Sequence, residues 1–207
     1  MKKLLCLLLF CTTASWATNQ IEFDLGRGTP ESYIQANGSD DRQGGRGTAW
    51  SADILHQTSG AVYVGLGGGY FHSNDYVSPT FAPGTVSTID SHAHTVLLLS
   101  RLDLTSNPKF LPYALVGAGW VDNELSVKDA GGNSLISDSK STYGYALGLG
   151  VDIALNDRLF VGLETRYQSG PKQSFSLSPE AQALTGAGSV ETRSTVFLLG
   201  LKAGVKY

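Results

Sequence analysis

Cysteine is nearly absent from this sequence: its 207 residues include only Cys6 and Cys11, both within the first eleven positions. The rest of the chain therefore cannot form a disulfide framework or a cysteine-based metal or redox site. Phe10 stands where a small residue should precede a lipid-modified cysteine, which disfavours a lipoprotein. We expect no cofactor.

Long apolar runs are also lacking. The first 17 residues, MKKLLCLLLFCTTASWA, hold two lysines, a short apolar core and the plausible cleavage site Ser15-Trp16-Ala17. They predict a secretory signal peptide, cleaved after about Ala17, because the apolar core is too short to span a bilayer as a helix. No later run reaches the length of a transmembrane helix, so the exported chain could be a membrane protein only as a closed barrel.

Positive charge is scarce too. Lysine and arginine number 15 against 18 acidic residues, and loss of Lys2 and Lys3 with the signal takes the formal net charge from −3 to −5. An acidic chain without a basic patch excludes nucleic acid as a partner. The mean hydropathy of −0.04 fits a soluble protein and a β-barrel equally well.

The closing stretch, TRSTVFLLGLKAGVKY, is the most informative part of the chain. Every second residue is apolar from Phe197 to Tyr207, while Lys202 and Lys206 fall on the other face. Strict alternation predicts a β-strand, and one this long suits lipid on one side and a polar lumen on the other. The 25 glycines lie mainly inside such alternating runs, which favours a closely packed lumen over a flexible linker.

Eight stretches have this strand character, and they cover residues 19–28, 48–57, 61–72, 91–105, 110–122, 142–155, 158–168 and 192–207. Short turns alternate with long polar connections at about 27–47, 73–90, 123–141 and 169–191. We therefore predict an all-β fold, an eight-stranded antiparallel up-and-down transmembrane β-barrel, as one domain over residues 18–207. A lipocalin-like soluble barrel is the alternative, but it turns its apolar face inward.

Two segments, FLPYALVGAGW and YGYALGLGVDIALNDRLFVGLETRYQ, carry recognisable motifs. These motifs are Pro112-Tyr113, Gly148-Leu149-Gly150, Asn156-Asp157 and Glu164-Thr165-Arg166-Tyr167. In them the chain resembles the OmpA-like and Opa-like outer-membrane β-barrel family. The resemblance implies residence in the outer membrane of a Gram-negative envelope, and insertion by the outer-membrane assembly machinery through the C-terminal strand.

Charged side chains on the inward face form the main candidate site. A narrow eight-stranded lumen is filled by side chains, and buried charges must be paired, so we predict a structural ion-pair network. Arg101 with Asp103 and Glu164 with Arg166 are expected pairs, and Glu22 and Asp24 are expected partners of the two closing-strand lysines. A rearrangeable network that gates a narrow channel is the alternative. The expected members are Glu22, Asp24, Asp53, Arg101, Asp103, Asp152, Glu164, Arg166, Lys202 and Lys206.

Outward aromatic residues near strand ends predict girdles that hold the barrel at the lipid–water interfaces. The expected members are Trp50, Tyr70, Trp120, Tyr143, Tyr167 and Tyr207. Three histidines, His72, His92 and His94, lie near the outer ends of the predicted strands over 61–72 and 91–105. His92 and His94 share a face and could bind a divalent metal with a further partner, but we expect interfacial polar residues there and no metal site.

An enzyme is the less favoured functional class. A lipid A deacylase-like barrel needs a histidine and a serine together near the outer end of one strand, with an acidic residue to orient the histidine. Ser169 follows the Glu164–Gln168 run without a neighbouring histidine, and His56 lies near a turn at the opposite end. We therefore expect no catalytic residues. The predicted function is a structural or adhesion role, with lipopolysaccharide, membrane lipids and a possible host or surface ligand as partners of four polar outer loops.

Overall fold

The computed structural model describes residues 18–36, 39–44, 47–76, 86–107, 109–129, 131–185 and 188–207. The predicted signal peptide lies outside these residues, so its cleavage after Ala17 stays a prediction. Within the described residues, no helix has the length and apolar character needed to cross a membrane.

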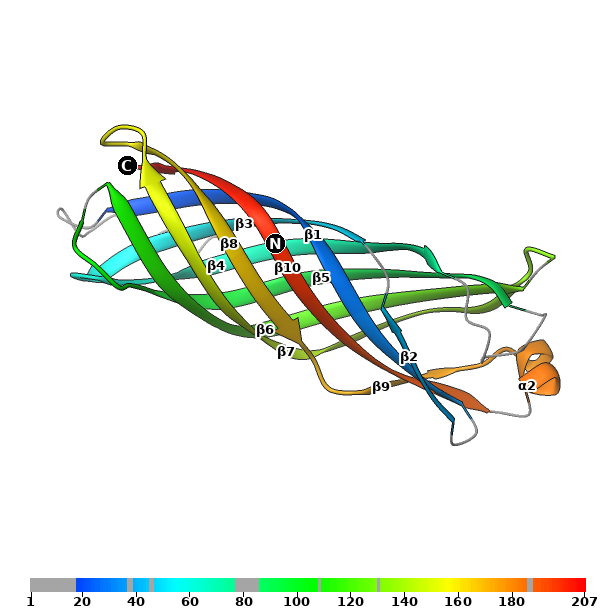
Figure 1. Ribbon diagram of the computed structural model, residues 1–207. Coiled ribbons are helices and arrows are strands. Elements are labelled where there is room, and N and C mark those ends of the chain that lie inside the picture. Colours follow the sequence, from blue (N-terminus) through cyan, green and yellow to red (C-terminus); the bar gives the residue numbers. More distant parts are fainter. Residues whose placement is uncertain are drawn as a thin grey trace, which may run out of the picture.

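A single antiparallel sheet closes on itself to form the molecule (Figure 1). Its eight wall strands are β1 (Asn19–Ala36), β3 (Gly47–Ser59), β4 (Val62–Tyr76), β5 (Val86–Asp103), β6 (Phe110–Asp129), β7 (Ser134–Ala154), β8 (Leu159–Ser169) and β10 (Ser189–Lys206). Each strand pairs with the next, and β1 pairs with β10 along a register that runs from Gln20↔Lys206 to Gln35↔Glu191. The eight-stranded antiparallel barrel predicted from the sequence is confirmed.

The wall follows directly from the alternation in the sequence. Along β10, Leu199 and Leu201 are 57% and 69% exposed on the outside, whereas Lys202 on the inside is 2% exposed. Leu98 and Leu149 on other strands are likewise exposed by 61% and 62%. An apolar surface that continues around the whole wall is far larger than a water-soluble protein presents, and it fits contact with lipid.

Both ends of the described chain meet at the short-turn end of the barrel. Asn19 and Tyr207 exchange two backbone hydrogen bonds of 3.0 Å, which fasten the first strand to the last. Tight turns join β3 to β4 and β7 to β8 at this end, on the left in Figure 1. Gly60 in the first of these turns has a φ of 45°, a conformation that favours glycine.

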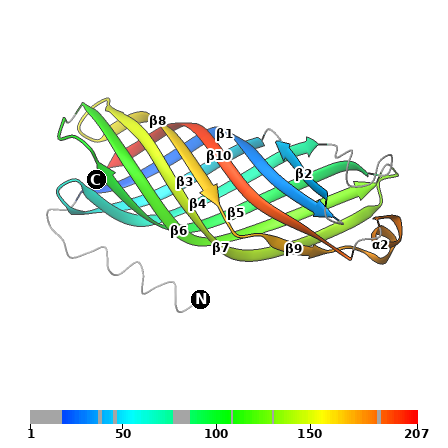
Figure 2. The same ribbon diagram turned by 60° about the horizontal axis from the view of Figure 1, so that its bottom comes forward.

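The opposite, outer end differs from the sequence prediction, because the strands continue further. β6 and β7 stay paired to Lys128↔Ser134, so residues predicted as a loop over 123–141 are mostly strand. Alternation continues there, with Leu125 and Val127 buried inside. Two more strands, β2 (Ser39–Gly44) on β1 and β9 (Gln173–Ser176) on β10, and the short helix α2 (Pro179–Thr185) occupy other predicted loops (Figure 2).

Glycines let neighbouring strands approach closely. A Cβ added at Gly65 would lie 1.8 Å from the Ile54 carbonyl oxygen, and one at Gly119 would lie 2.1 Å from the Val96 carbonyl oxygen. No side chain fits such distances without a shift of the backbone. The glycines therefore keep the wall tight and leave the lumen to the large charged and aromatic side chains of other positions.

Candidate functional site

The inside of the barrel concentrates the charged residues of the wall strands. The residues buried there, each 8% exposed or less, are Glu22, Asp24, Asp53, Arg101, Asp103, Asp152, Glu164, Arg166 and Lys202. They come from β1, β3, β5, β7, β8 and β10, and strand parity directs each of them inward. Lys206, the tenth predicted member, is only partly buried, at the short-turn end.

Arg101 is the centre of the first cluster. Its guanidinium lies 2.6 Å from Glu22 Oε1, 2.8 Å from Asp103 Oδ1 and 2.7 Å from Asp152 Oδ2. Lys202 Nζ completes this cluster at 3.1 Å from Glu22 Oε2 and 2.9 Å from Asp152 Oδ1. Two cations therefore share the two carboxylates of β1 and β7, an arrangement in which every charge has an opposite neighbour.

Arg166 is the centre of the second cluster. It lies 2.6 Å from Asp53 Oδ2, 2.5 Å from Glu164 Oε1 and 4.0 Å from Asp24 Oδ2. Asp24 also accepts a 3.3 Å hydrogen bond from the Ser51 hydroxyl. The contact between Arg166 on β8 and Asp53 on β3 spans the lumen, since these strands are not neighbours in the sheet.

Tyr113 joins the two clusters. Its hydroxyl donates a 2.7 Å hydrogen bond to Glu164 Oε2 in the second cluster. Its ring lies under both cations of the first cluster, with its centroid 3.9 Å from Arg101 Cζ and 4.0 Å from Lys202 Nζ. Sequence reasoning missed this residue, although the signal was there. Tyr113 and Trp120 are seven residues apart, so an outward Trp120 places Tyr113 inward.

One expected partnership is wrong. Lys206 does not reach Glu22 or Asp24; its Nζ lies 5.7 Å from the centroid of the Phe160 ring. The reason is the register, which sets Lys206 opposite Gln20, two residues along β1 from Glu22 and four from Asp24. At about 3.4 Å per residue, these separations are about 7 and 14 Å.

Little space is left beside the second cluster. The cavity beside the second cluster, next to Asp24, Ser51 and Arg166, measures about 20 Å3. That volume is room for about one water molecule. Six buried carboxylates surround three buried cations in this plug, so its side chains are held by charge as well as by packing.

The predicted girdle residues lie on the outside of the wall. Trp50 lies between Phe23 and Tyr70, with ring centroids 6.3 and 6.2 Å away, and Trp120 lies 5.6 Å from Tyr143. Tyr167 pairs with Tyr145 at 6.2 Å, and Tyr207 is 63% exposed at the short-turn end. Rings of this kind are suited to the boundary between hydrocarbon and water.

The serine and histidine of the deacylase-like alternative do not meet. Ser169 Oγ is buried and lies 3.1 Å from Thr195 Oγ1. His56 is at the short-turn end, where its Nδ1 lies 2.7 Å from Asn19 Oδ1. A threonine hydroxyl is not a base, so this contact does not activate the serine.

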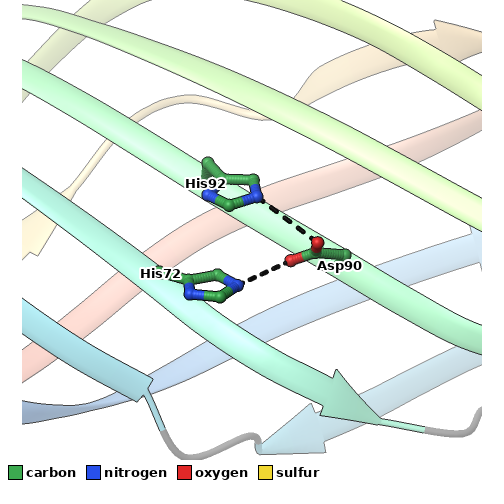
Figure 3. Close-up of side chains that lie close together, drawn as sticks. All are labelled: His72, Asp90 and His92. Carbon is green, nitrogen blue, oxygen red and sulfur yellow. Dashed lines mark hydrogen bonds and ion pairs between the residues drawn. The ribbon is translucent and has the colours of Figure 1, made fainter.

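Three other side chains on the outer face could hold a metal ion. His72, Asp90 and His92 lie together (Figure 3), and the Tyr70 hydroxyl contacts His92. His94, which the sequence suggested as the companion of His92, instead lies against the Tyr70 ring, with centroids 4.9 Å apart.

Comparisons with known structures agree with this architecture. OprG from Pseudomonas aeruginosa is 16% identical, with a TM-score of 0.59 over 91% of this chain and 96% of that one, and this likeness shows the fold. Neisserial surface protein A is 15% identical, with a TM-score of 0.45 over 89% and 97% of the two chains. Ail from Yersinia pestis is 15% identical, with a TM-score of 0.44 over 91% and 99%.

A search of curated protein sequences finds no match. In contrast, a comparison with protein families matches residues 4–203 to the family described as outer membrane protein beta-barrel domain. That match covers nearly the whole chain, and it agrees with the closed barrel, its apolar outer wall and its aromatic rings. The protein therefore belongs to the outer membrane protein beta-barrel domain family and is an outer-membrane β-barrel protein.

Proposed function

We propose that this protein is a non-enzymatic surface protein: a sealed barrel anchors it in the outer membrane, and its outer strands and loops provide structural or adhesive contacts. One observation carries the proposal. The lumen is plugged by buried ion pairs, while the wall strands continue past the aromatic rings into a packed outer region.

The plug argues against transport through the lumen. Arg101 is fully buried and contacts three carboxylates at 2.6 to 2.8 Å. A pathway at this level requires at least one of these contacts to break, and stranding a buried charge costs about 3–5 kcal/mol. A lumen filled in this way favours a stable membrane anchor over a transport pathway.

The outer region argues for a presented surface. The segment that carries β9 and α2 begins after the last residue of β8. Its buried apolar side chains are Phe175, Leu177 and Ala181. The Ser178 amide donates a 3.2 Å hydrogen bond to the Leu135 carbonyl of β7. Burial of apolar side chains outside the membrane holds this segment in a fixed place, which favours recognition by shape.

Further bonds fix the same segment to the β6–β7 hairpin. Gln173 Oε1 accepts a 2.7 Å hydrogen bond from Asn123 Nδ2, and Gln173 Nε2 donates one of 2.9 Å to the Lys140 carbonyl. Lys140 in turn donates to the Ser174 carbonyl and lies 5.4 Å from the Phe175 ring centroid. The platform formed by β6, β7, β9 and α2 is therefore held by polar as well as apolar contacts.

The partners follow from the surfaces. The apolar wall and its aromatic rings fit membrane lipid and lipopolysaccharide, and the platform offers a face to a host or surface ligand. We include the assembly machinery as a partner because the alternating strand β10 is followed by the exposed aromatic Tyr207.

Replacement of residues 171–187 with a short glycine-serine turn tests the proposal. Cells that produce this variant should lose surface contacts such as adherence, or envelope resistance to detergent, relative to cells with the intact protein. A heat-modifiable gel shift shows whether the barrel still folds. If folded variants lacking each outer connection in turn leave adherence and envelope resistance unchanged, the proposal is wrong. Stepwise currents in planar bilayers, or altered lipid A masses after incubation with the purified barrel, would contradict it independently.

A further inference from the structure

The outer ends of β4 and β5 bring two histidines and an aspartate together on the outside of the wall (Figure 3). His72 on β4 and His92 on β5 are direct partners in the register. Asp90 precedes His92 by two residues and so projects from the same face. All three are about one-quarter to one-third exposed, so an ion from solution can reach them.

An irregularity in the sheet places the carboxylate between the two rings. The register passes from Ser73↔Ser91 to Tyr76↔Ile89, so two residues of β4 stand opposite Asp90 alone. Such a bulge bends a strand and redirects its side chains. Asp90 Oδ1 lies 3.0 Å from His72 Nε2, and its Oδ2 lies 3.4 Å from His92 Nε2.

The geometry matches a zinc ligand set. The imidazole rings are nearly parallel, with centroids 4.4 Å apart and planes inclined by 7°. One ligand atom from each residue can be chosen so that all lie within 4.8 Å of one another. A tetrahedral zinc ion with bonds of about 2.0–2.1 Å needs ligand atoms roughly 3.3–3.5 Å apart. Side-chain rotation must therefore bring the most distant pair closer by no more than about 1.5 Å.

A neighbouring side chain orients one of the ligands. Tyr70 Oη lies 2.6 Å from His92 Nδ1, on the side of the ring away from Asp90. With Nδ1 donating to this hydroxyl, Nε2 carries the lone pair that a metal requires. Metal-ligating histidines usually have such a partner on their other nitrogen.

We propose that His72, Asp90 and His92 form a site for a divalent transition metal, of which zinc is the best match, at the outer membrane boundary. Two imidazoles favour zinc over calcium or magnesium, which prefer oxygen ligands throughout. Three protein ligands leave a fourth position for water. This site is independent of the role proposed for the loops, since it lies on the wall strands.

Zinc binding to the mature, tag-free barrel in detergent tests the proposal. After treatment with a chelator, equilibrium dialysis against zinc with a large excess of magnesium should show one zinc ion per chain. His72→Ala and His92→Ala should each reduce binding to background. Tyr70→Phe keeps all three ligands, and it should weaken binding about tenfold through loss of the orienting hydroxyl.

His94→Ala is the matched control, because His94 lies on the same face of β5 and outside the ligand set. It should bind zinc as the unmodified protein does. Cobalt in place of zinc should give the intense visible absorption of a four-coordinate ion, and His72→Ala should abolish it. The proposal is wrong if the unmodified barrel retains no zinc, if the His72→Ala/His92→Ala double variant retains it, or if His94→Ala loses it equally.

Discussion

Replacement of Arg101 with methionine should strongly destabilise the barrel. The side chain is completely buried, and it provides the single ion pair of Asp103 among the described residues, at 2.8 Å. Methionine is unbranched, shorter than arginine and uncharged, so the substitution leaves Asp103 with its charge uncompensated inside the lumen. Glu22 and Asp152 would keep Lys202, at 3.1 and 2.9 Å, and so lose only part of their stabilisation.

The expected cost is that of one stranded buried charge, about 3–5 kcal/mol in the free energy of unfolding. Arg101→Lys should fall between the two proteins, because an ammonium group cannot reproduce three guanidinium contacts in fixed directions. The double variant Arg101→Met/Asp103→Asn should recover part of the loss. Lys206→Met is the matched control, since this partly exposed lysine contacts the Phe160 ring, and it should cost less than about 1 kcal/mol.

Urea titration of the refolded protein in lipid vesicles measures these differences. Fluorescence of Trp50 and Trp120 reports unfolding, and the heat-modifiable gel shift reports barrel closure independently. If Arg101→Met lies within about 1 kcal/mol of the unmodified protein, or matches the Lys206→Met control, the inference that the ion pairs hold the lumen closed is refuted.

Three further predictions concern the wall, the plug and the outer turn. Gly65→Ala should destabilise the barrel by about 1–3 kcal/mol in the same titration, because the added Cβ would lie 1.8 Å from a β3 carbonyl oxygen. Gly68→Ala is the control and should be tolerated, since the nearest atom to its added Cβ lies 3.8 Å away. Tyr113→Phe should cost about 1–3 kcal/mol by removing a 2.7 Å hydrogen bond to a buried carboxylate, and an unchanged urea midpoint would contradict this. Hydrogen bonds from the Asn133 side chain and backbone lower the pKa of Asp129. These bonds should therefore stabilise the turn fully above the ordinary aspartate pKa, and the stabilisation should be lost as the pH falls through the lowered pKa of Asp129. An NMR titration in which Asn133→Ala fails to raise that pKa would refute the assignment to the side-chain hydrogen bond.

Alternation alone was enough to predict the wall. Each predicted strand has a counterpart, and the side of the wall that each charged residue faces follows from counting in twos. Glycines within the strands predicted a narrow lumen. In the structure they allow neighbouring strands to approach closely, as Gly65 does to Ile54. Pattern therefore determined which residues share the lumen.

The partners within the lumen could not be predicted in the same way. Pairs on one strand, such as Arg101 with Asp103, need only local spacing. Contacts across the barrel, such as Arg166 with Asp53, depend on strand tilt and stagger, which fix the height of each residue along the axis. The expected pairing of Lys206 with Glu22 and Asp24 was wrong because it depended in the same way on the register between β1 and β10.

The outer end shows a second limit of the sequence. Polar composition marked residues 123–141 as a loop, but a polar hairpin in water can stay paired as long as its inward side chains remain buried. Likewise, His92 was grouped with His94 because they share a strand face, while Asp90, two residues before His92, fell within a predicted loop. The bulge that sets Asp90 beside His72 is not revealed by periodicity.

The extended β6–β7 hairpin has a consequence for what can touch this protein from outside the cell. Nine residues separate Trp120, in the aromatic ring, from Asp129 at the end of β6. At about 3.4 Å per residue and a tilt of about 40°, the strand rises roughly 23 Å above the hydrocarbon boundary. Where lipid-linked sugars are shorter than this rise, they would surround the lower part of the stalk and leave its tip clear. An antibody or a receptor could then engage the tip without first displacing the carbohydrate layer.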